Sequence, residues 1–143
     1  MVGTKWSAVP WGVGAALVIV VASAAAPVAA HSPASHRLAE RIVLMNPDNG
    51  RPVPASLGDD IEVRLTSYRK NGLNYTWGIP QSSDSTVLQR TAGATTPDGG
   101  ASAVFHAEHA GKATISAHRS CRPDPGRVCP LVVVPWKATV TVK

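Results

Sequence analysis

The chain carries few aromatic residues and no run of charges of one sign. Aromatic side chains make up 5% of its 143 residues, and 14 Lys and Arg against 9 Asp and Glu, spread along the chain, give a net charge of +5. A surface that binds nucleic acid needs basic residues clustered on one element. We therefore predict no nucleic-acid partner, and take the charge as a contribution to solubility.

The sequence also lacks the motifs that carry catalysis or bind metals. No Gly-x-Ser-x-Gly elbow is present, and the two cysteines are not spaced as Cys-x-x-Cys. His106, Glu108 and His118 fall at outward positions of expected strands, but on different strands, with no ligand geometry implied. We predict a protein that is not an enzyme and that has no cofactor and no metal. A metal site using His106 and His118 is a minor alternative.

An apolar N-terminal stretch indicates export. Residues 12–26 are uncharged, and residues 28–30, Val-Ala-Ala, place small side chains where a signal peptidase cleaves. We predict a signal peptide over residues 1–30, cleavage before His31, and a secreted protein. An uncleaved membrane anchor stays open as the alternative, because the uncharged stretch 6–30 is long enough to span a bilayer.

Export makes a disulfide the expected state of the cysteines. Cys121 and Cys129 are the only two, so one pairing within the chain exists, and thiols oxidise outside the cytosol. The bridge closes a small loop and is worth about 2.5 kcal/mol by chain entropy, so it shapes mainly that loop. Within it, Asp124-Pro125-Gly126 predicts a type II turn, with proline at the second position and glycine at the third.

From Arg41 onward, apolar residues recur at every second position, which is the pattern of strands. The pattern predicts an all-β domain over residues 41–143, preceded by a polar lead-in at 31–40. An immunoglobulin-like antiparallel β-sandwich of about seven strands and a small barrel both fit, and two facing sheets suit the many Ala and Val side chains. We expect Trp77, in a central strand, to be the core aromatic. The seven segments are 41–45, 60–65, 75–79, 85–91, 101–111, 112–119 and 136–143.

Several of these stretches together resemble one family. "LGDDIEVRL" opens with Gly-Asp before a strand, "YTW" has an aromatic residue two positions before tryptophan, and "AGKATISAHRSCRP" runs into an Arg-Pro loop before the closing "WKATVTVK". Over residues 53–143 this pattern resembles the chagasin-like inhibitors of cysteine proteases. The resemblance implies a secreted immunoglobulin-like sandwich whose three loops, at one end, plug the active-site cleft of a papain-type protease.

The three matching loops depart from the family motifs. Residues 70–74, Lys-Asn-Gly-Leu-Asn, stand where the family has Asn-Pro-Thr-Thr-Gly, so Asn74 replaces a glycine and is expected to accept a positive φ. Residues 97–100 replace Gly-x-Gly-Gly, and residues 122–124 replace Arg-Pro-Trp. The resemblance implies that the partner-binding residues are Asn71, Gly72, Leu73, Asn74, Asp98, Gly99, Gly100, Arg122 and Pro123.

We therefore expect a secreted monomer that binds a protein partner through these loops. The resemblance makes that partner a cysteine protease, inhibited by steric occlusion. The alternative is a structural or adhesive surface module of the same fold, in which the disulfide only orders a long hairpin. We expect contact with a membrane only if the N-terminal segment stays uncleaved as an anchor.

Overall fold

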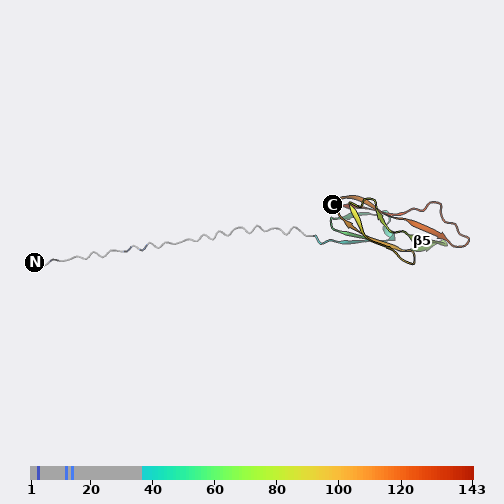
Figure 1. Cartoon of the computed structure of the whole chain (residues 1–143), viewed down its shortest axis with the longest axis horizontal. Helices are drawn as coiled ribbons and strands as arrows, with labels where there is room; N and C mark the ends of the chain where they lie inside the picture. The colour runs from blue at the N-terminus through green and yellow to red at the C-terminus, as the bar shows by residue number, and fades with distance from the viewer. Residues whose placement is uncertain (1–2, 4–11, 13, 15–36) are drawn as a thin grey trace. The chain divides into compact units, whose positions relative to one another are not determined.

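The computed structural model describes residues 37–143, together with Gly3, Gly12 and Gly14. Apart from those glycines, residues 1–36 lie outside the described residues, and with them the predicted signal peptide and most of the lead-in. Residues 37–143 form one compact unit of strands (Figure 1). In the described part of the chain, no helix has the length and apolarity needed to cross a membrane.

Strands account for nearly all regular structure in the described residues, which contain eleven of them and one short 3-10 helix, η1. The prediction of an all-β fold is thus confirmed. In chain order the elements are β1 (Arg41–Leu44), η1 (Asn46–Asp48), β2 (Pro52–Ala55), β3 (Asp60–Leu65), β4 (Tyr68–Lys70), β5 (Leu73–Trp77), β6 (Gln81–Ser82), β7 (Leu88–Thr95), β8 (Ala101–Ala107), β9 (Gly111–Ala117), β10 (Arg119–Pro123) and β11 (Trp136–Val142).

The predicted number of about seven strands is too low, because four short strands have no alternating pattern of their own. β2 reads Pro-Val-Pro-Ala, and proline normally argues against a strand that is not at a sheet edge. β4 and β6 have three and two residues, and β10 reads Arg-Ser-Cys-Arg-Pro. Each forms because a longer neighbour supplies its hydrogen bonds, which is a long-range event that local sequence does not show.

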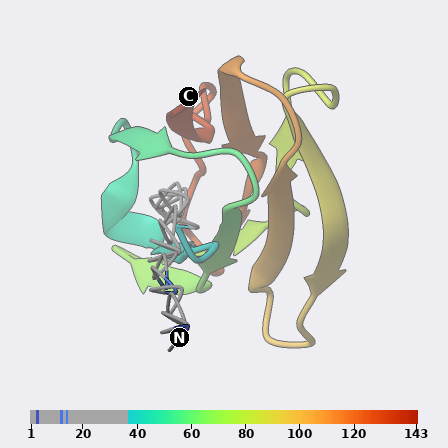
Figure 2. The same ribbon diagram turned by 90° about the vertical axis from the view of Figure 1, so that its left-hand side faces the viewer.

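The strands form two four-stranded sheets, β1-β3-β8-β7 and β2-β11-β9-β6, and a three-stranded sheet, β10-β5-β4. Most neighbours are antiparallel, as predicted, and Figure 2 shows β7 and β8 as a broad hairpin. The edge pairs β1–β3 and β2–β11 are parallel instead. For β1 and β3 the cause is β2, which lies between them in the chain but in the other sheet, so the chain reverses twice and returns in its original direction.

The core lies between the inner faces of the two four-stranded sheets, and alternation places the inward residues there. In β3, register pairs Ile61 with Phe105 of β8, and both are fully buried. In the other sheet, Ile115 of β9 pairs with Ala138 of β11. The buried residues that alternation predicts are Ile61, Val63, Leu65, Ala103, Phe105, Ala107, Ala113, Ile115, Ala117, Trp136, Ala138, Val140 and Val142.

Trp77 belongs to the hydrophobic core, as the sequence predicts, although two other aromatic residues are buried more deeply. Trp136 and Phe105 are 1% and 0% exposed, against 8% for Trp77. Trp77 belongs to β5 in the three-stranded sheet, at the margin of the core, where its indole Nε1 donates to the carbonyl of Thr66 at 3.0 Å. The indole therefore links β5 to the end of β3 and leaves the centre to Phe105 and Trp136.

One buried carboxylate fastens the start of β1 to the turn before β3. Asp59 is 1% exposed, and its two oxygens accept the backbone N–H groups of Glu40 (3.0 Å) and Ser56 (2.8 Å). Arg37 lies 3.7 Å away. Burial opposes ionisation of Asp59, but the two hydrogen bonds and the nearby guanidinium outweigh it, so its pKa lies below the ordinary value. The charged form therefore stabilises the fold.

Replacing Asp59 by asparagine should lower the free energy of unfolding by about 1–3 kcal/mol, because the N–H groups of Glu40 and Ser56 lose a charged acceptor. Since the native pKa is depressed, the stabilisation is complete above the unfolded pKa of about 3.9 and is lost as pH falls through the native value. Urea unfolding at neutral pH and at about pH 3 measures both effects. Asp60→Asn is the control, because its exposed ion pairs should contribute at most about 1 kcal/mol. Equal losses from the two variants contradict the assignment.

Candidate functional site

A two-residue turn at Asn71 and Gly72 closes the hairpin between β4 and β5. Lys70 pairs directly with Leu73, and Asn71 and Gly72 have φ of 53° and 72°. Two successive positive φ values define a type I′ turn, for which Asn-Gly is the favoured sequence. The positive φ expected at Asn74 is wrong: among the described residues Asn71 alone of the non-glycine residues has one, and Asn74 lies inside β5.

The disulfide and the turn predicted within its loop are both present. Cys121 in β10 is bonded to Cys129, and their Cα atoms are 6.1 Å apart. Gly126 has φ of 78°, and the N–H of Arg127 donates to the carbonyl of Asp124 at 3.0 Å. These are the hydrogen bond and the glycine conformation of a type II turn. Residues 121–129 are thus a loop closed by a covalent bond and turned by a hydrogen bond.

Asp124 joins this disulfide loop to the β4–β5 hairpin. Its N–H donates to the carbonyl of Gly72 at 2.9 Å, and Oδ1 accepts from Nδ2 of Asn74 at 3.0 Å. Its Oδ2 is ion-paired with the guanidinium of Arg69. β5 and β10 are also antiparallel neighbours. Hairpin and disulfide loop therefore behave as one unit, with Asp124 at its centre.

The third loop, residues 96–100, closes on itself and is held to β5 by one glycine. The N–H of Gly99 donates to Thr96 at 3.0 Å, and that of Gly100 donates to the Thr96 hydroxyl at 2.9 Å. The carbonyl of Gly99 accepts the N–H of Trp77 at 2.9 Å. Gly99 has φ of 93°, and a Cβ there would lie 2.5 Å from Cγ2 of Thr76. The loop can approach β5 this closely only with glycine at that position.

A hollow of about 670 Å³ lies between the 96–100 loop and strands β5 and β10, and each of the three stretches contributes at least one residue to its lining. The structure therefore brings together the three stretches that the resemblance selects, toward the end of the unit where Figure 1 labels β5. Four of the predicted partner-binding residues line this hollow: Asn74, Asp98, Gly99 and Arg122.

The other predicted residues do not line this hollow. Asn71 and Pro123 are exposed, and Leu73 is half-buried. A Cβ on Gly72 would lie 2.9 Å from Cγ of Arg127, so the two loops touch there. Gly100 is buried, and a Cβ on it would lie 2.9 Å from the carbonyl oxygen of Leu65, so its role in the structure is to let the loop turn against β3.

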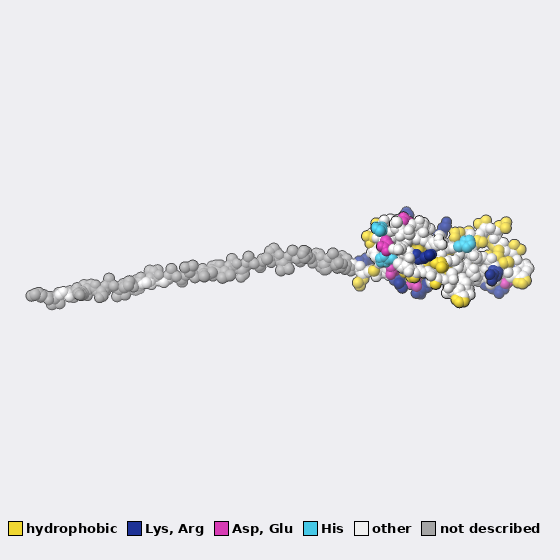
Figure 3. Space-filling model, in the orientation of Figure 1, with side chains coloured by type: hydrophobic (Ala, Val, Ile, Leu, Met, Phe, Trp, Pro, Cys, Tyr) yellow, Lys and Arg dark blue, Asp and Glu magenta, His cyan; other side chains and the backbone are white. Residues whose placement is uncertain are grey.

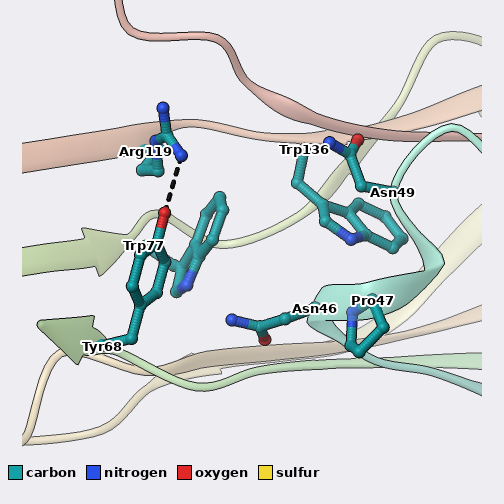
Figure 4. A pocket seen from close by; sticks show the side chains of 7 residues that line it. All are labelled: Asn46, Pro47, Asn49, Tyr68, Trp77, Arg119 and Trp136. Atoms are coloured by element: carbon teal, nitrogen blue, oxygen red, sulfur yellow. Dashed lines mark hydrogen bonds between the residues drawn. The ribbon is translucent and has the colours of Figure 1, made fainter. Parts of the chain in front are cut away.

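An aromatic cluster that sequence reasoning missed stiffens the base of the hairpin. Tyr68 and Tyr75 are stacked with ring centroids 4.8 Å apart, and the guanidinium of Arg119 lies 4.6 Å from the Tyr75 centroid. Arg119 also donates to the Tyr68 hydroxyl at 2.6 Å (Figure 4). The Asn71-Gly72 dipeptide could have indicated this cluster from the sequence, because a two-residue turn at 71–72 makes Tyr68 and Tyr75 cross-strand partners.

A second hollow, of about 370 Å³, lies beside this cluster. Figure 4 shows Tyr68, Trp77, Arg119 and Trp136 around it, with Asn46, Pro47 and Asn49 from the segment that includes η1. Trp77 and Trp136 are 8% and 1% exposed, so their ring faces are committed to packing. The side-chain amide of Asn46 donates to the carbonyl of Thr66 and accepts its N–H, at 2.8 Å each. Arg119 is bonded to the Tyr68 hydroxyl through Nη1, whereas its Nε is buried without a hydrogen-bond partner among the described residues.

The two histidines of the metal alternative have other surroundings. Nδ1 of His106 lies 2.8 Å from Oδ1 of Asp60, on the β3–β8 pair. His118 lies next to Gly78, between β9 and β10. Within residues 37–143, no group of three or more His, Cys, Asp or Glu side chains is arranged to hold a metal ion.

Comparison with known proteins gives structural matches only. No protein-family model matches the chain, and no curated protein matches it. Among solved structures, the chain is similar to the cysteine protease inhibitor EhICP2 from Entamoeba histolytica, with a TM-score of 0.49 and 10% identity over 73% of this chain and 96% of that one. It is also similar to amebosin, with a TM-score of 0.39 and 14% identity over 72% and 98% of the two chains.

Both TM-scores lie below 0.5, and both identities are low. We therefore base the proposed function on the loops of this chain and on their contacts.

Gly99→Ala should destabilise the protein more than Gly58→Ala. Both glycines have positive φ, 93° and 87°, so alanine costs about 1–2 kcal/mol at either position. Only at Gly99 does the added Cβ meet Thr76, which should add about 1–3 kcal/mol and displace the loop. Thermal unfolding measures the difference, and amide exchange of Trp77 reports whether its bond to Gly99 is lost. Equal destabilisation by the two substitutions would show that the 96–100 loop accommodates the added Cβ at no cost in free energy.

The 96–100 loop should also depend on acid in a defined way. The Thr96 hydroxyl and the Gly100 N–H donate to Asp98, and these bonds hold the pKa of its carboxyl below the ordinary value. The carboxylate therefore orders the loop above about pH 3.9, and the order is lost as pH falls through the lowered native pKa.

Thr96→Val should raise the pKa of Asp98 toward the ordinary value, because it removes the hydroxyl donor. NMR titration of the side-chain carboxyl carbons measures this directly. Asp84 is the internal control, since the hydroxyl and N–H of Thr86 lower its pKa in the same manner and are untouched by the substitution. An unchanged Asp98 titration contradicts the role of Thr96.

Proposed function

We propose that this protein binds a papain-type cysteine protease with its three-loop end and inhibits it by filling the active-site cleft. The observation that carries the proposal is that residues 70–74, 97–100 and 122–124 lie near one another: each stretch contributes to the lining of one hollow, and the N–H of Asp124 donates to the carbonyl of Gly72. The resemblance assigns inhibition to these same three stretches, although they lie far apart in the sequence. Their convergence supports a shared binding surface.

The proposed mechanism is steric and needs no bond chemistry. Every loop is ordered before it meets the partner: the hairpin by its type I′ turn, the disulfide loop by Cys121–Cys129 and Asp124, and residues 96–100 by Thr96. Ordered loops lose less conformational entropy on docking, so more of the contact energy appears as affinity. The paired cysteines have no thiolate to act as a nucleophile.

We also propose that the protein acts outside the cytosol. The disulfide supports this, because such bonds persist in oxidising compartments. The N-terminal stretch of the sequence, interpreted as a signal peptide, supports it independently.

Titration of active papain with the purified chain tests the proposal. We expect inhibition in the nanomolar range by the wild type, and inhibition weakened by about tenfold or more for Asp124→Ala, which removes the carboxylate contacts to Asn74 and Arg69 and so loosens the link between hairpin and disulfide loop. Glu108→Gln, in the turn between β8 and β9, is the control and should inhibit like the wild type. Absence of inhibition by wild type at high micromolar concentration removes the protease proposal and favours the structural or adhesive module.

A further inference from the structure

An exposed apolar segment follows the disulfide loop. Val128, Leu131, Val132 and Val134 are 85%, 102%, 76% and 60% exposed, and they are four of the eight large apolar side chains exposed in the described chain. Figure 3 shows hydrophobic side chains gathered at the right-hand end, where Figure 1 draws this segment in red. Exposed apolar side chains that cluster in this way commonly mark an interaction surface.

The backbone of this segment is unpaired as well. Residues 128–135 belong to no strand, and no backbone hydrogen bond joins them to any other described residue. Pro130 and Pro135 bound a run of Leu-Val-Val-Val, and each proline favours an extended conformation in the residue before it. Branched residues such as valine favour strands. Leu131–Val134 therefore offers free N–H and C=O groups on a chain suited to β pairing.

The surroundings of the segment are basic. The loop end, taken as residues 69–74, 96–100 and 119–134, carries five Lys and Arg against two Asp, and one of these, Asp124, is paired with Arg69. The other described residues carry eight Lys and Arg against seven Asp and Glu. The positive charge is thus concentrated beside the apolar segment, which favours a partner with acidic residues.

We propose that Leu131–Val134 docks as an added strand against an extended segment of the protein partner, one with alternating apolar side chains and flanking acidic residues. Backbone hydrogen bonds would supply affinity, and the side chains and charges would supply specificity. This inference rests on the proposed function only in placing the partner at the loop end. It adds a mode of binding outside the three loops of the resemblance.

Two other occupants fit the same observations less well. A second copy of the chain would bring two basic loop ends together, and like charges in juxtaposition are unfavourable. Insertion into a bilayer would bury unpaired backbone groups in hydrocarbon, which costs several kcal/mol per group. A protein strand satisfies both the backbone and the charge.

The probe is the peptide acetyl-Glu-Glu-Thr-Val-Thr-Val-Thr-Glu-Glu-amide at millimolar concentration, added to the ¹⁵N-labelled chain. We expect amide exchange of alternate residues in Leu131–Val134 to slow by about tenfold, with chemical-shift changes centred there. The peptide with lysine in place of every glutamate is the matched control and should have little effect. Equal protection by both peptides, or none by the acidic one, overturns the proposal.

Backbone variants separate strand pairing from simple apolar contact. Val132→Pro and Val133→Pro each remove one N–H, and at least one of them should abolish the protection. Val132→Thr keeps the backbone and the branched shape, and should retain binding within about threefold. If both proline variants bind like the wild type, the segment does not pair as a strand.

Further measurements distinguish a protein strand from a second copy of the chain and from a membrane, and they do not depend on protease inhibition. Concentration-dependent dimerisation that protects the same amides replaces the partner by a second copy. Binding to phosphatidylglycerol–phosphatidylcholine vesicles, with no protection by peptide, replaces it by a membrane. Papain inhibition without peptide protection leaves the proposed function standing and removes this inference, whereas peptide protection without papain inhibition does the reverse.

Discussion

The loop end of this protein depends on one residue, Asp124, which uses all four of its polar groups. Its N–H bonds to Gly72, its carbonyl to Arg127, and its two carboxylate oxygens to Asn74 and Arg69. The type I′ turn orders only the hairpin, and the disulfide orders only its own loop. Without Asp124, these would be two locally ordered loops, joined through the β5–β10 ladder, the bond from the Asn74 amide to the carbonyl of Arg122 and the contact of Gly72 with Arg127.

All three loops are attached to strand β5. It forms one arm of the hairpin, pairs with β10 ahead of the disulfide loop, and accepts the 96–100 loop through the bond between Trp77 and Gly99. The sandwich core lies beside it, between the other two sheets, with Trp77 and the Tyr68–Tyr75 stack at the junction. Loops fixed to one strand keep their relative positions, which a binding surface made of separate segments requires.

The apolar segment after the disulfide has a different character from the three loops. The loops are closed by hydrogen bonds and packed glycines, whereas Leu131–Val134 exposes both its side chains and its backbone. Exposing apolar side chains contributes nothing to folding, since the stabilisation comes from their removal from water. A surface that combines ordered loops with an unpaired, strand-forming segment is suited to a partner that contacts the loops and also pairs with the segment.

Local sequence determined the parts of this structure that local chemistry controls. Alternation identified most of the longer strands and the faces they bury, but not β7, which the pattern predicts at 85–91 and which has seven exposed residues in a row. The cysteine count set the disulfide, and Asp124-Pro125-Gly126 specified its turn. Tertiary structure decided the rest: the four short strands, the parallel edge pairs, the deeper burial of Phe105 and Trp136 than of Trp77, and the positive φ at Asn71 in place of Asn74. It also decided that Asp124 meets Gly72, more than fifty positions away. Those features arise when segments that are distant in the sequence pair with each other. The local sequence of one segment does not indicate which distant segment it will contact.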